Sequence, residues 1–311
     1  MTTEGAPEEP GLELLDSREA EVGAMRVRRA LPRRTHRTVG AWCFADHMGP
    51  APVTEEHGLD IGPHPHIGLQ TVTWLLAGEA LHRDGLGSEQ LLRPGQLNLM
   101  TAGHGVAHSE EATGTYRGDL HGIQLWVAQP DGTRDGPPAF EHHGELPRVE
   151  LDGAVATVLV GDLAGTTSPA RRDTDHVGAQ LDVRTGRTTV PLRTGHEHAL
   201  VVLEGSVRVG TTVVAPGHLA YLAPGGEVLI VEAGAPARVM LLGGVPFPSP
   251  ILMWWNFVAR DASEMAAARD AWEMRASRFG EVASSLARIP APAPSWRVDT
   301  VERTQGSTPP R

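Results

Sequence analysis

Short runs of apolar or alternating residues, separated by Gly, Pro and Asp turns, fill the middle of the chain. Turns that recur roughly every ten to fifteen residues are typical of an antiparallel sandwich or barrel. The clearest runs lie at 21–31, 69–77, 96–100, 121–128, 155–160, 199–203 and 228–232. The pattern therefore predicts an all-β fold over most of the chain.

One stretch near the end of the chain departs from this pattern. Asp261 and Glu264 have the spacing of a capping box, and Met265, Ala268 and Trp272 follow at helical intervals. We expect a short C-terminal α-helix that ends near residue 280 and closes the β structure.

An internal repeat divides the strands into two related units. Segment 94–103 begins Pro-Gly-Gln-Leu and ends in Gly, and segment 216–225 begins Pro-Gly-His-Leu and ends in Gly at the same spacing. Each segment follows an apolar strand that ends in Leu-x-Gly. We expect disordered tails at 1–11 and 286–311, an N-terminal barrel at 12–135, a linker at 136–147, a C-terminal barrel at 148–258 and a helical region at 259–285.

Composition narrows the classes of function. The 311 residues are 40% hydrophobic and 21% charged, as in an ordinary soluble chain. The 27 basic and 38 acidic residues give a formal net charge of −11, which disfavours direct nucleic-acid binding. No segment resembles a signal peptide or a membrane span. The single Cys43 excludes an intramolecular disulfide and suits a reducing compartment, so we expect a cytoplasmic protein, which we take to be a monomer.

Two pairs of candidate metal ligands flank the first strand unit. His64 and His66 precede one strand run, and His108 and Glu110 follow a glycine-rich turn. Residues two apart on a strand point to the same face, so each pair projects into one interior. A closed barrel can then bring three imidazoles and one carboxylate together.

This ligand set suits one divalent first-row metal ion. Zinc, iron, nickel, cobalt, copper and manganese all bind imidazole nitrogen and carboxylate oxygen. An octahedral ion with four protein ligands keeps two positions open for substrate, dioxygen or water, whereas a tetrahedral ion is nearly closed. Spacing alone leaves open the alternative that these histidines lie in loops by accident.

The second unit lacks this ligand set. Its four matching positions hold Pro191, Arg193, Ile230 and Glu232. His196 and His198 form a separate pair, but they lie five residues closer to the turn than the first pair does. We therefore expect one metal site, in the N-terminal barrel, and regard metal binding by this separate pair as the less favoured alternative.

Longer stretches around these residues resemble the pirin family of the cupin superfamily. The most specific are 60–78, which reads DIGPHPHIGLQTVTWLLAG, and 100–110, which reads MTAGHGVAHSE. Segment 39–50 resembles the family's entry segment, and parts of 241–258 resemble its C-terminal cupin and the approach to its last helix. The resemblance extends from about residue 15 to residue 285.

The resemblance implies two tandem cupin barrels of the jelly-roll kind, with a metal ion in the N-terminal barrel only. In the family's pattern the ligands are His64, His66, His108 and Glu110. The ion is usually described as non-haem Fe(II), and Mn, Ni, Co, Cu or Zn remain open. Ile67 and Gln70 stand where many relatives have Arg and Glu, so the surroundings of the metal differ from theirs.

Pirin-like proteins imply two hypotheses about function. In the first, a dioxygenase opens a flavonol such as quercetin, or a related enol, with Glu110 taking the hydroxyl proton. In the second, the chain is a non-enzymatic regulator, in which the oxidation state of iron alters a surface that binds a protein partner.

Several further residues have both a structural and a functional interpretation. The basic cluster is a candidate docking patch, although we favour a solvated edge strand. Its members are Arg26, Arg28, Arg29, Arg33, Arg34 and Arg37. We favour a turn role for His104, a core role for Cys43, and barrel filling over pocket lining for Trp74 and Trp126.

Overall fold

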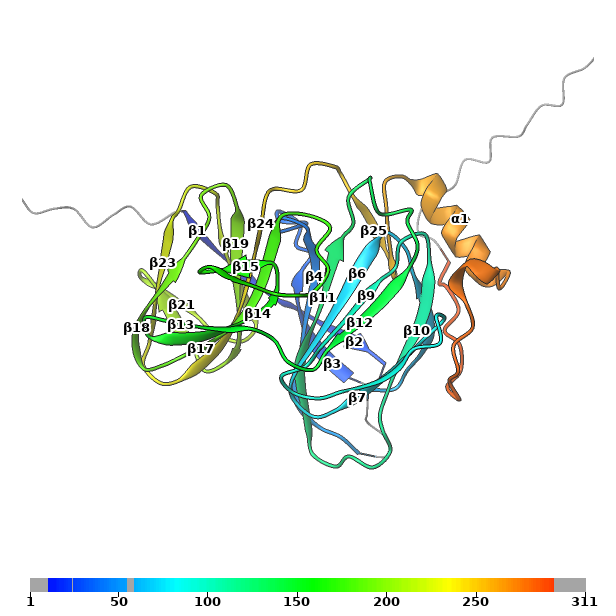
Figure 1. Cartoon of the computed structure of the whole chain (residues 1–311), viewed down its shortest axis with the longest axis horizontal. Helices are drawn as coiled ribbons and strands as arrows, with labels where there is room; N and C mark the ends of the chain where they lie inside the picture. Colours follow the sequence, from blue (N-terminus) through cyan, green and yellow to red (C-terminus); the bar gives the residue numbers. More distant parts are fainter. Residues whose placement is uncertain (1–10, 24, 55–58, 294–311) are drawn as a thin grey trace, which may run out of the picture.

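In the computed structural model, which describes residues 11–23, 25–54 and 59–293, two β-barrels lie side by side (Figure 1). Each barrel is built from a seven-stranded and a four-stranded antiparallel sheet. A single α-helix, α1 (Ala262–Glu273), follows the strands. The expected all-β fold of two cupin barrels with a short C-terminal helix is confirmed.

The N-terminal barrel holds the candidate ligands. Its seven-stranded sheet has the order β12-β9-β6-β11-β4-β3-β2, and its four-stranded sheet has the order β5-β10-β7-β8. The strands are β2 (Arg18–Val22), β3 (Met25–Leu31), β4 (Trp42–Pro52), β5 (Ile61–His66), β6 (Leu69–Ala77), β7 (Ala80–Asp84), β8 (Glu89–Leu92), β9 (Leu97–Thr101), β10 (Val106–Glu111), β11 (Asp119–Ala128) and β12 (Ala139–His143).

The C-terminal barrel repeats this plan. Its sheets have the orders β1-β22-β19-β24-β17-β14-β13 and β18-β23-β20-β21, and the short hairpins β15–β16 and β25–β26 lie outside them. The strands are β1 (Leu12–Asp16), β13 (Arg148–Leu151), β14 (Ala154–Val160), β15 (Asp162–Leu163), β16 (Thr166–Thr167), β17 (His176–Val183), β18 (Gly186–Pro191), β19 (Glu197–Glu204), β20 (Val207–Val209), β21 (Thr212–Val214), β22 (His218–Leu222), β23 (Val228–Ala233), β24 (Ala237–Gly244), β25 (Leu252–Trp254) and β26 (Phe257–Ala259).

The two seven-stranded sheets share a core between the barrels. On β24, Val239 and Leu241 pack inside the C-terminal barrel, whereas Met240 and Leu242 pack with residues such as Leu125 of the N-terminal barrel. Because both faces of such a strand are buried, its sequence is a continuous apolar run rather than an alternating one. This packing leaves the four-stranded sheets on the outer sides.

The expected segment boundaries differ from the structure in three places. β1, expected in the N-terminal barrel, pairs with β22 of the C-terminal barrel. The expected linker contains β12, which pairs with β9 of the N-terminal barrel. In both cases an edge strand gains backbone hydrogen bonds from a partner that is distant in sequence. Residues 1–10 and 294–311 of the expected tails lie outside the described residues.

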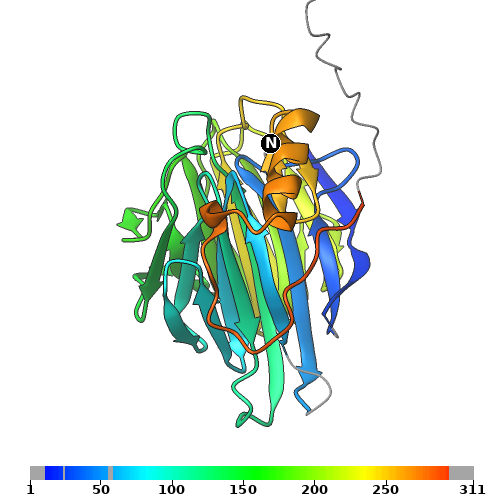
Figure 2. The same cartoon turned by 90° about the vertical axis from the view of Figure 1, so that its right-hand side faces the viewer.

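The third difference concerns the segment after the helix. Asp261 caps α1 by accepting from the backbone N–H groups of Ser263 and Glu264. The helix ends at Glu273, earlier than expected, and a 3-10 turn, η1 (Ser277–Phe279), follows. Residues 281–293 then run down the outer side of the N-terminal barrel, turn and run back up along it (Figure 2). No helix of the described residues is long and apolar enough to span a membrane.

Candidate metal centre

β5 and β10 carry the three histidines predicted as ligands. The two strands are antiparallel neighbours, and His64 lies directly opposite His108. β5 is an edge strand, which accommodates Pro63 and Pro65 although they lack a backbone N–H. His64 and His66 alternate with these prolines, so both imidazoles leave the same face of the sheet.

The three imidazoles meet in the barrel interior. Nε2 of His66 lies 3.0 Å from Nε2 of His108. The ring centroid of His64 is 4.4 Å from that of His108. One ring nitrogen of each histidine lies within 4.8 Å of the other two, and all three side chains are buried. The structure thus brings together three of the four residues predicted as ligands.

Hydrogen bonds decide which ring nitrogens face this cluster. Nδ1 of His64 lies 2.9 Å from the carbonyl oxygen of Gly62, and Nδ1 of His66 lies 2.9 Å from that of Asn256. Because a carbonyl oxygen only accepts, each of these Nδ1 atoms carries the proton. Nε2 of both rings therefore presents a lone pair to the cluster.

Burial keeps the three rings neutral. It lowers the pKa of His64 to about 4. Burial, and then the nearby His64 ring, lower the pKa values of His66 and His108 well below the usual one. Neutral imidazole is the form that binds metal ions, and Nε2 of His66 and Nε2 of His108, 3.0 Å apart, are close enough to share one cation. The donor set therefore fits a divalent first-row metal.

Glu110 lies in the same cavity but outside the group of nitrogens. The register of β10 against β5 shifts between His108 and Glu110, and such an irregularity re-aims a side chain. Oε1 of Glu110 accepts a hydrogen bond from the Thr73 hydroxyl at 3.2 Å. Burial raises the pKa of Glu110, although His82 and Thr73 act in the opposite direction. The carboxyl group is thus buried near the histidines.

A cavity of about 390 Å³ opens from the histidine cluster. Its aromatic wall consists of Phe44 and Trp126, whose stacked rings have centroids 4.0 Å apart. The Trp126 ring meets the His66 ring edge-on at 5.2 Å. Trp126 therefore lines the cavity, which was the functional alternative for this residue. Trp74 lies between the barrels, where its indole N–H donates to Gln180.

An ion pair that no sequence pattern predicted lines this cavity. Arg29, expected on a solvated strand face, donates from Nε and Nη2 to the two carboxylate oxygens of Asp46 at 2.8 and 2.7 Å. Burial raises the pKa of Asp46, although Arg29 lowers it. Arg29 lies two residues after buried Val27, so the two side chains leave the same face of β3. This spacing is the sequence signal that the guanidinium faces inward.

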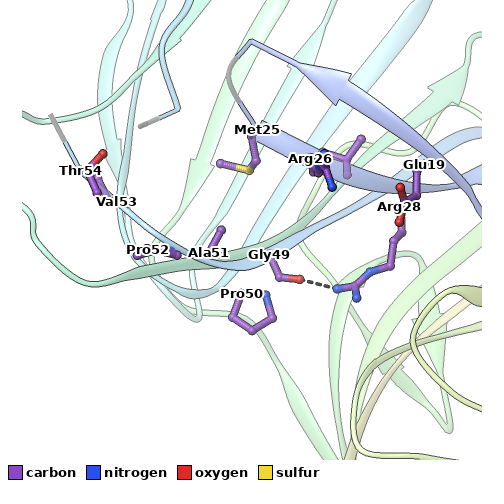
Figure 3. Close-up of a pocket in the computed structure, with 11 residues that line it drawn as sticks. Glu19, Met25, Arg26, Arg28, Gly49, Pro50, Ala51, Pro52, Val53 and Thr54 are labelled. Carbon is purple, nitrogen blue, oxygen red and sulfur yellow. Dashed lines mark hydrogen bonds between the residues drawn. The ribbon is translucent and has the colours of Figure 1, made fainter. Parts of the chain in front are cut away.

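A second cavity, of about 600 Å³, lies beside β3 and the end of β4 (Figure 3). Arg26 and Arg28 of the basic cluster line it, and Arg28 donates to the carbonyl oxygen of Gly49. Glu19 lies opposite Arg28 on the neighbouring strand. The described residues that line this cavity include no histidine, so it offers no ligand set like that of the first cavity.

The matching strands of the C-terminal barrel carry no such cluster. In β18 and β23, Val190 lies opposite Leu229, and Thr188 lies opposite Val231. The ring centroids of His196 and His198 are 5.8 Å apart, but no third residue among those described completes a metal-binding group with them. Within the described part of the chain, the ligand set is therefore found in one barrel only.

His104 and Cys43 have structural roles. His104 is exposed, and its Nδ1 lies 2.9 Å from the carbonyl oxygen of Gly136. Cys43 is fully buried, and burial raises the pKa of its thiol to about 12. Both favoured interpretations, a turn residue and a core residue, are confirmed.

Two segments from the far end of the chain complete the site. Asn256 supplies the carbonyl oxygen that orients His66, and Trp255 and Ile289 line the cavity.

A pair of side chains on β7 also belongs to the site. His82 and Asp84 are buried beside His108. None of these additional residues was predicted as part of the site. The His-x-Asp spacing of His82 and Asp84 on one strand was the one usable signal.

Comparisons with known proteins agree with this architecture. Residues 24–127 match the family model described as Pirin, and residues 179–280 match the Pirin C-terminal cupin domain. The chain is 47% identical to a Pseudomonas aeruginosa protein named "Putative quercetin 2,3-dioxygenase", over 93% of this chain and 92% of that one. It is 35% identical to a Caulobacter vibrioides protein named "Pirin-like protein", over 84% of this chain and 92% of that one.

A solved structure extends the comparison to three dimensions. The crystal structure of quercetin 2,3-dioxygenase from Acinetobacter baumannii matches with a TM-score of 0.89 and 44% identity, over 92% of this chain and 97% of that chain. The two family models fall one on each barrel, and the relatives match over nearly their whole length. The chain therefore belongs to the pirin family.

Proposed function

We propose that this protein is a metal-dependent dioxygenase that acts on a flavonol such as quercetin or on a related enol. The observation that supports this most directly is the arrangement of one cavity. Three neutral imidazoles converge at one end of it, and a flat aromatic wall lies beside them. The names of the Pseudomonas and Acinetobacter relatives point to the same activity.

The proposed ligands of the ion are Nε2 of His64, His66 and His108, with the Glu110 carboxylate as the fourth. Iron(II) is the proposed ion, because imidazole and carboxylate ligands with open positions suit non-haem iron chemistry. The bound ion would supply the redox centre and the Lewis acid at which dioxygen and the substrate oxygens react. Manganese, nickel, cobalt, copper and zinc are outcomes that a metal analysis distinguishes.

The chain's own residues position the substrate. A planar ring system fits against the stacked faces of Phe44 and Trp126, where contact between flat rings is favourable. The ion pair of Arg29 and Asp46 lines the same cavity and offers polar contacts to substrate hydroxyl or carbonyl groups. These groups would hold the reacting enol next to the histidine cluster.

Glu110 is the proposed base. Its carboxyl group lies in the cavity and is held by the Thr73 hydroxyl, within the same enclosed space as a bound enol. Proton transfer to a positioned carboxylate typically contributes a rate factor of about 10² to 10⁴. Glu110 would take the proton of the substrate hydroxyl and thereby leave an anionic oxygen.

The test compares Glu110→Gln with Glu111→Gln. Both proteins are purified without oxygen and loaded with ferrous iron; metal content and quercetin-dependent oxygen uptake are then measured. We expect Glu110→Gln to keep most of its iron and to lose about a hundredfold or more in turnover. Glu111 bonds Arg83 and Ser109 and does not line the cavity, so its variant should retain turnover. Unchanged turnover in Glu110→Gln would contradict the role of Glu110.

The regulatory alternative is not favoured, since the Pseudomonas and Acinetobacter relatives, which match 93% and 92% of this chain, are named for an enzymatic activity. It makes a different prediction in the same experiment. Stoichiometric iron without oxygen uptake on any flavonol would support it, and His108→Ala should abolish the iron content in either case.

A further inference from the structure

His108 differs from the other two candidate ligands in the partner of its second nitrogen. Nδ1 of His64 and of His66 face carbonyl oxygens, which only accept hydrogen bonds. Nδ1 of His108 instead lies 3.3 Å from Nδ1 of His82, which accepts or donates according to its tautomer. The proton position on His108 therefore depends on that of His82.

Asp84 settles the tautomer of His82. Nε2 of His82 lies 3.1 Å from Oδ2 of Asp84. Burial by itself would raise the pKa of Asp84, but hydrogen bonds from His82 and Ser88 outweigh it and lower the pKa overall. An ionised carboxylate only accepts, so Nε2 of His82 carries the proton and its Nδ1 has a free lone pair.

We propose that His82 and Asp84 are positioning residues that hold His108 with its proton on Nδ1 and its Nε2 lone pair directed at the metal. This inference rests on the proposed metal centre. In the resulting chain, Nδ1–H of His108 donates to Nδ1 of His82, and Nε2–H of His82 donates to Asp84. All three rings of the cluster then present unprotonated Nε2 atoms to one point.

The surrounding structure holds this chain in place. Oδ1 of Asp84 accepts from the backbone N–H groups of Leu86 and Ser88, each at 2.9 Å, which fixes the carboxylate in the turn after β7. The Phe140 ring stacks on the His82 ring with centroids 4.3 Å apart and an interplanar angle of 12°. His82 and Asp84 are both buried, so water does not compete for their hydrogen bonds.

Outer hydrogen bonds of this kind affect metal binding measurably. Loss of a partner of a ligating histidine typically weakens metal affinity by about 10- to 100-fold. His82→Phe retains a flat ring but removes the acceptor. His82→Asn retains an acceptor oxygen near the position of Nδ1. Comparing the two variants separates the hydrogen bond from packing.

The experiment measures binding of cobalt(II) by chelator competition and by the visible absorption of the bound ion. We expect His82→Phe to weaken cobalt binding by about 10- to 100-fold and to change the spectrum, and His82→Asn to restore most of both. His142→Phe is the control, since His142 bonds Asn98 and does not line the cavity of the cluster, and it should match the wild type. Equal effects of His82→Phe and His82→Asn, or no effect of His82→Phe, would overturn the proposal.

A second measurement needs no variant. Long-range ¹H–¹⁵N spectra of the metal-free wild type, with labelled histidine, report which ring nitrogen carries each proton. We expect the proton of His82 on Nε2, which leaves its Nδ1 as an acceptor for Nδ1–H of His108. A proton on Nδ1 of His82 would overturn the proposal. Because this readout needs neither metal nor activity, it stays informative if the wild type binds no cobalt, a result that would instead refute the proposed metal centre.

Discussion

At the scale of single residues, the inward-facing pair of Arg29 and Asp46 is the least expected feature of the cavity. Arg29 belongs to a run of arginines whose other members at 26 and 28 lie on the opposite side of β3. Two parallel hydrogen bonds hold the guanidinium on a carboxylate that is 2% exposed. A buried carboxylate without its partner is costly, so each residue depends on the other.

This dependence predicts the result of a double-mutant cycle. Arg29→Met should lower the free energy of unfolding by about 2–3 kcal/mol, because it leaves the Asp46 carboxylate buried and unpaired. Adding Asp46→Asn should recover part of that loss. Arg26→Met, on the exposed side of the same strand, should change the free energy by less than about 0.5 kcal/mol. Urea unfolding measures five proteins: the wild type, Arg29→Met, Asp46→Asn, the double variant and Arg26→Met. Equal losses for the two arginine variants would refute the pairing.

At the scale of elements, the segment after η1 lies against β5 and places Ile289 at the wall of the cavity. The backbone N–H of Ile289 donates to the carbonyl oxygen of Pro63 at 2.9 Å, and the indole N–H of Trp272 donates to the carbonyl oxygen of Ile289 at 2.9 Å. The Arg288 guanidinium lies 3.6 Å from the Trp272 ring centre. Gly62 beside Pro63 leaves no room for a Cβ against the Ala287 carbonyl. The segment therefore ties α1 to β5.

A pair of truncations tests whether this segment limits access to the cavity. A chain that ends at residue 280 loses Ile289 and its contact with β5, and we expect bound cobalt(II) to transfer to a chelator about tenfold faster or more. A chain that ends at residue 293 keeps every described contact and should release the ion at the wild-type rate. Stopped-flow absorption measures both rates. The same rate for both truncated chains would show that the segment does not control access.

At the scale of the whole molecule, the two barrels form one packed body. The indole N–H of buried Trp42, on β4, contacts the carbonyl oxygens of Val177 and Gly243 in the C-terminal barrel at 3.0 and 3.2 Å. Gly178 lies so close to this ring that an added Cβ would be 2.7 Å from it. With β1 paired to β22 as well, we expect the barrels to unfold together.

Buried histidines make the stability of this body dependent on pH. Burial lowers the pKa of His47 to about 3 and the pKa values of His176 and His198 to about 4. Nine described histidines have lowered pKa values, against two carboxyl groups, Asp46 and Glu110, whose raised pKa values act in the opposite direction. Below about pH 6.5 the unfolded chain therefore binds more protons than the folded one.

The metal-free protein should consequently lose stability as the pH falls from about 6.5 toward 4. The check is urea unfolding at several pH values in the presence of a chelator. His198→Asn, which removes one titrating ring from the C-terminal barrel, should show a smaller loss over this range than the wild type. A midpoint that stays constant or rises between pH 6.5 and 4 would contradict the prediction.

The local pattern of the chain was sufficient to predict the strands, α1 and the first pair of candidate ligands, His64 and His66. Alternation and turn spacing predicted the strands, the capping box at Asp261 predicted the start of α1, and the repeat predicted two barrels. The His-x-His spacing predicted that His64 and His66 share a face, since neighbouring residues of a strand point to opposite faces whatever its partner. Glu110 shares the cavity but lies outside the group of nitrogens, because the register of β10 against β5 shifts between His108 and Glu110. The sequence of a single strand does not reveal such a shift.

Only the tertiary structure decided which distant segments meet. The pairing of β1 with β22, the inward direction of Arg29, and the contacts of Asn256 and Ile289 with the site depend on how the sheets close and pack. The chain of His82 and Asp84 behind His108 depends on the register of β7 against β10. Local pattern records which face of a strand is buried, whereas the identity of the neighbour is determined by backbone hydrogen bonds and packing between segments far apart in sequence.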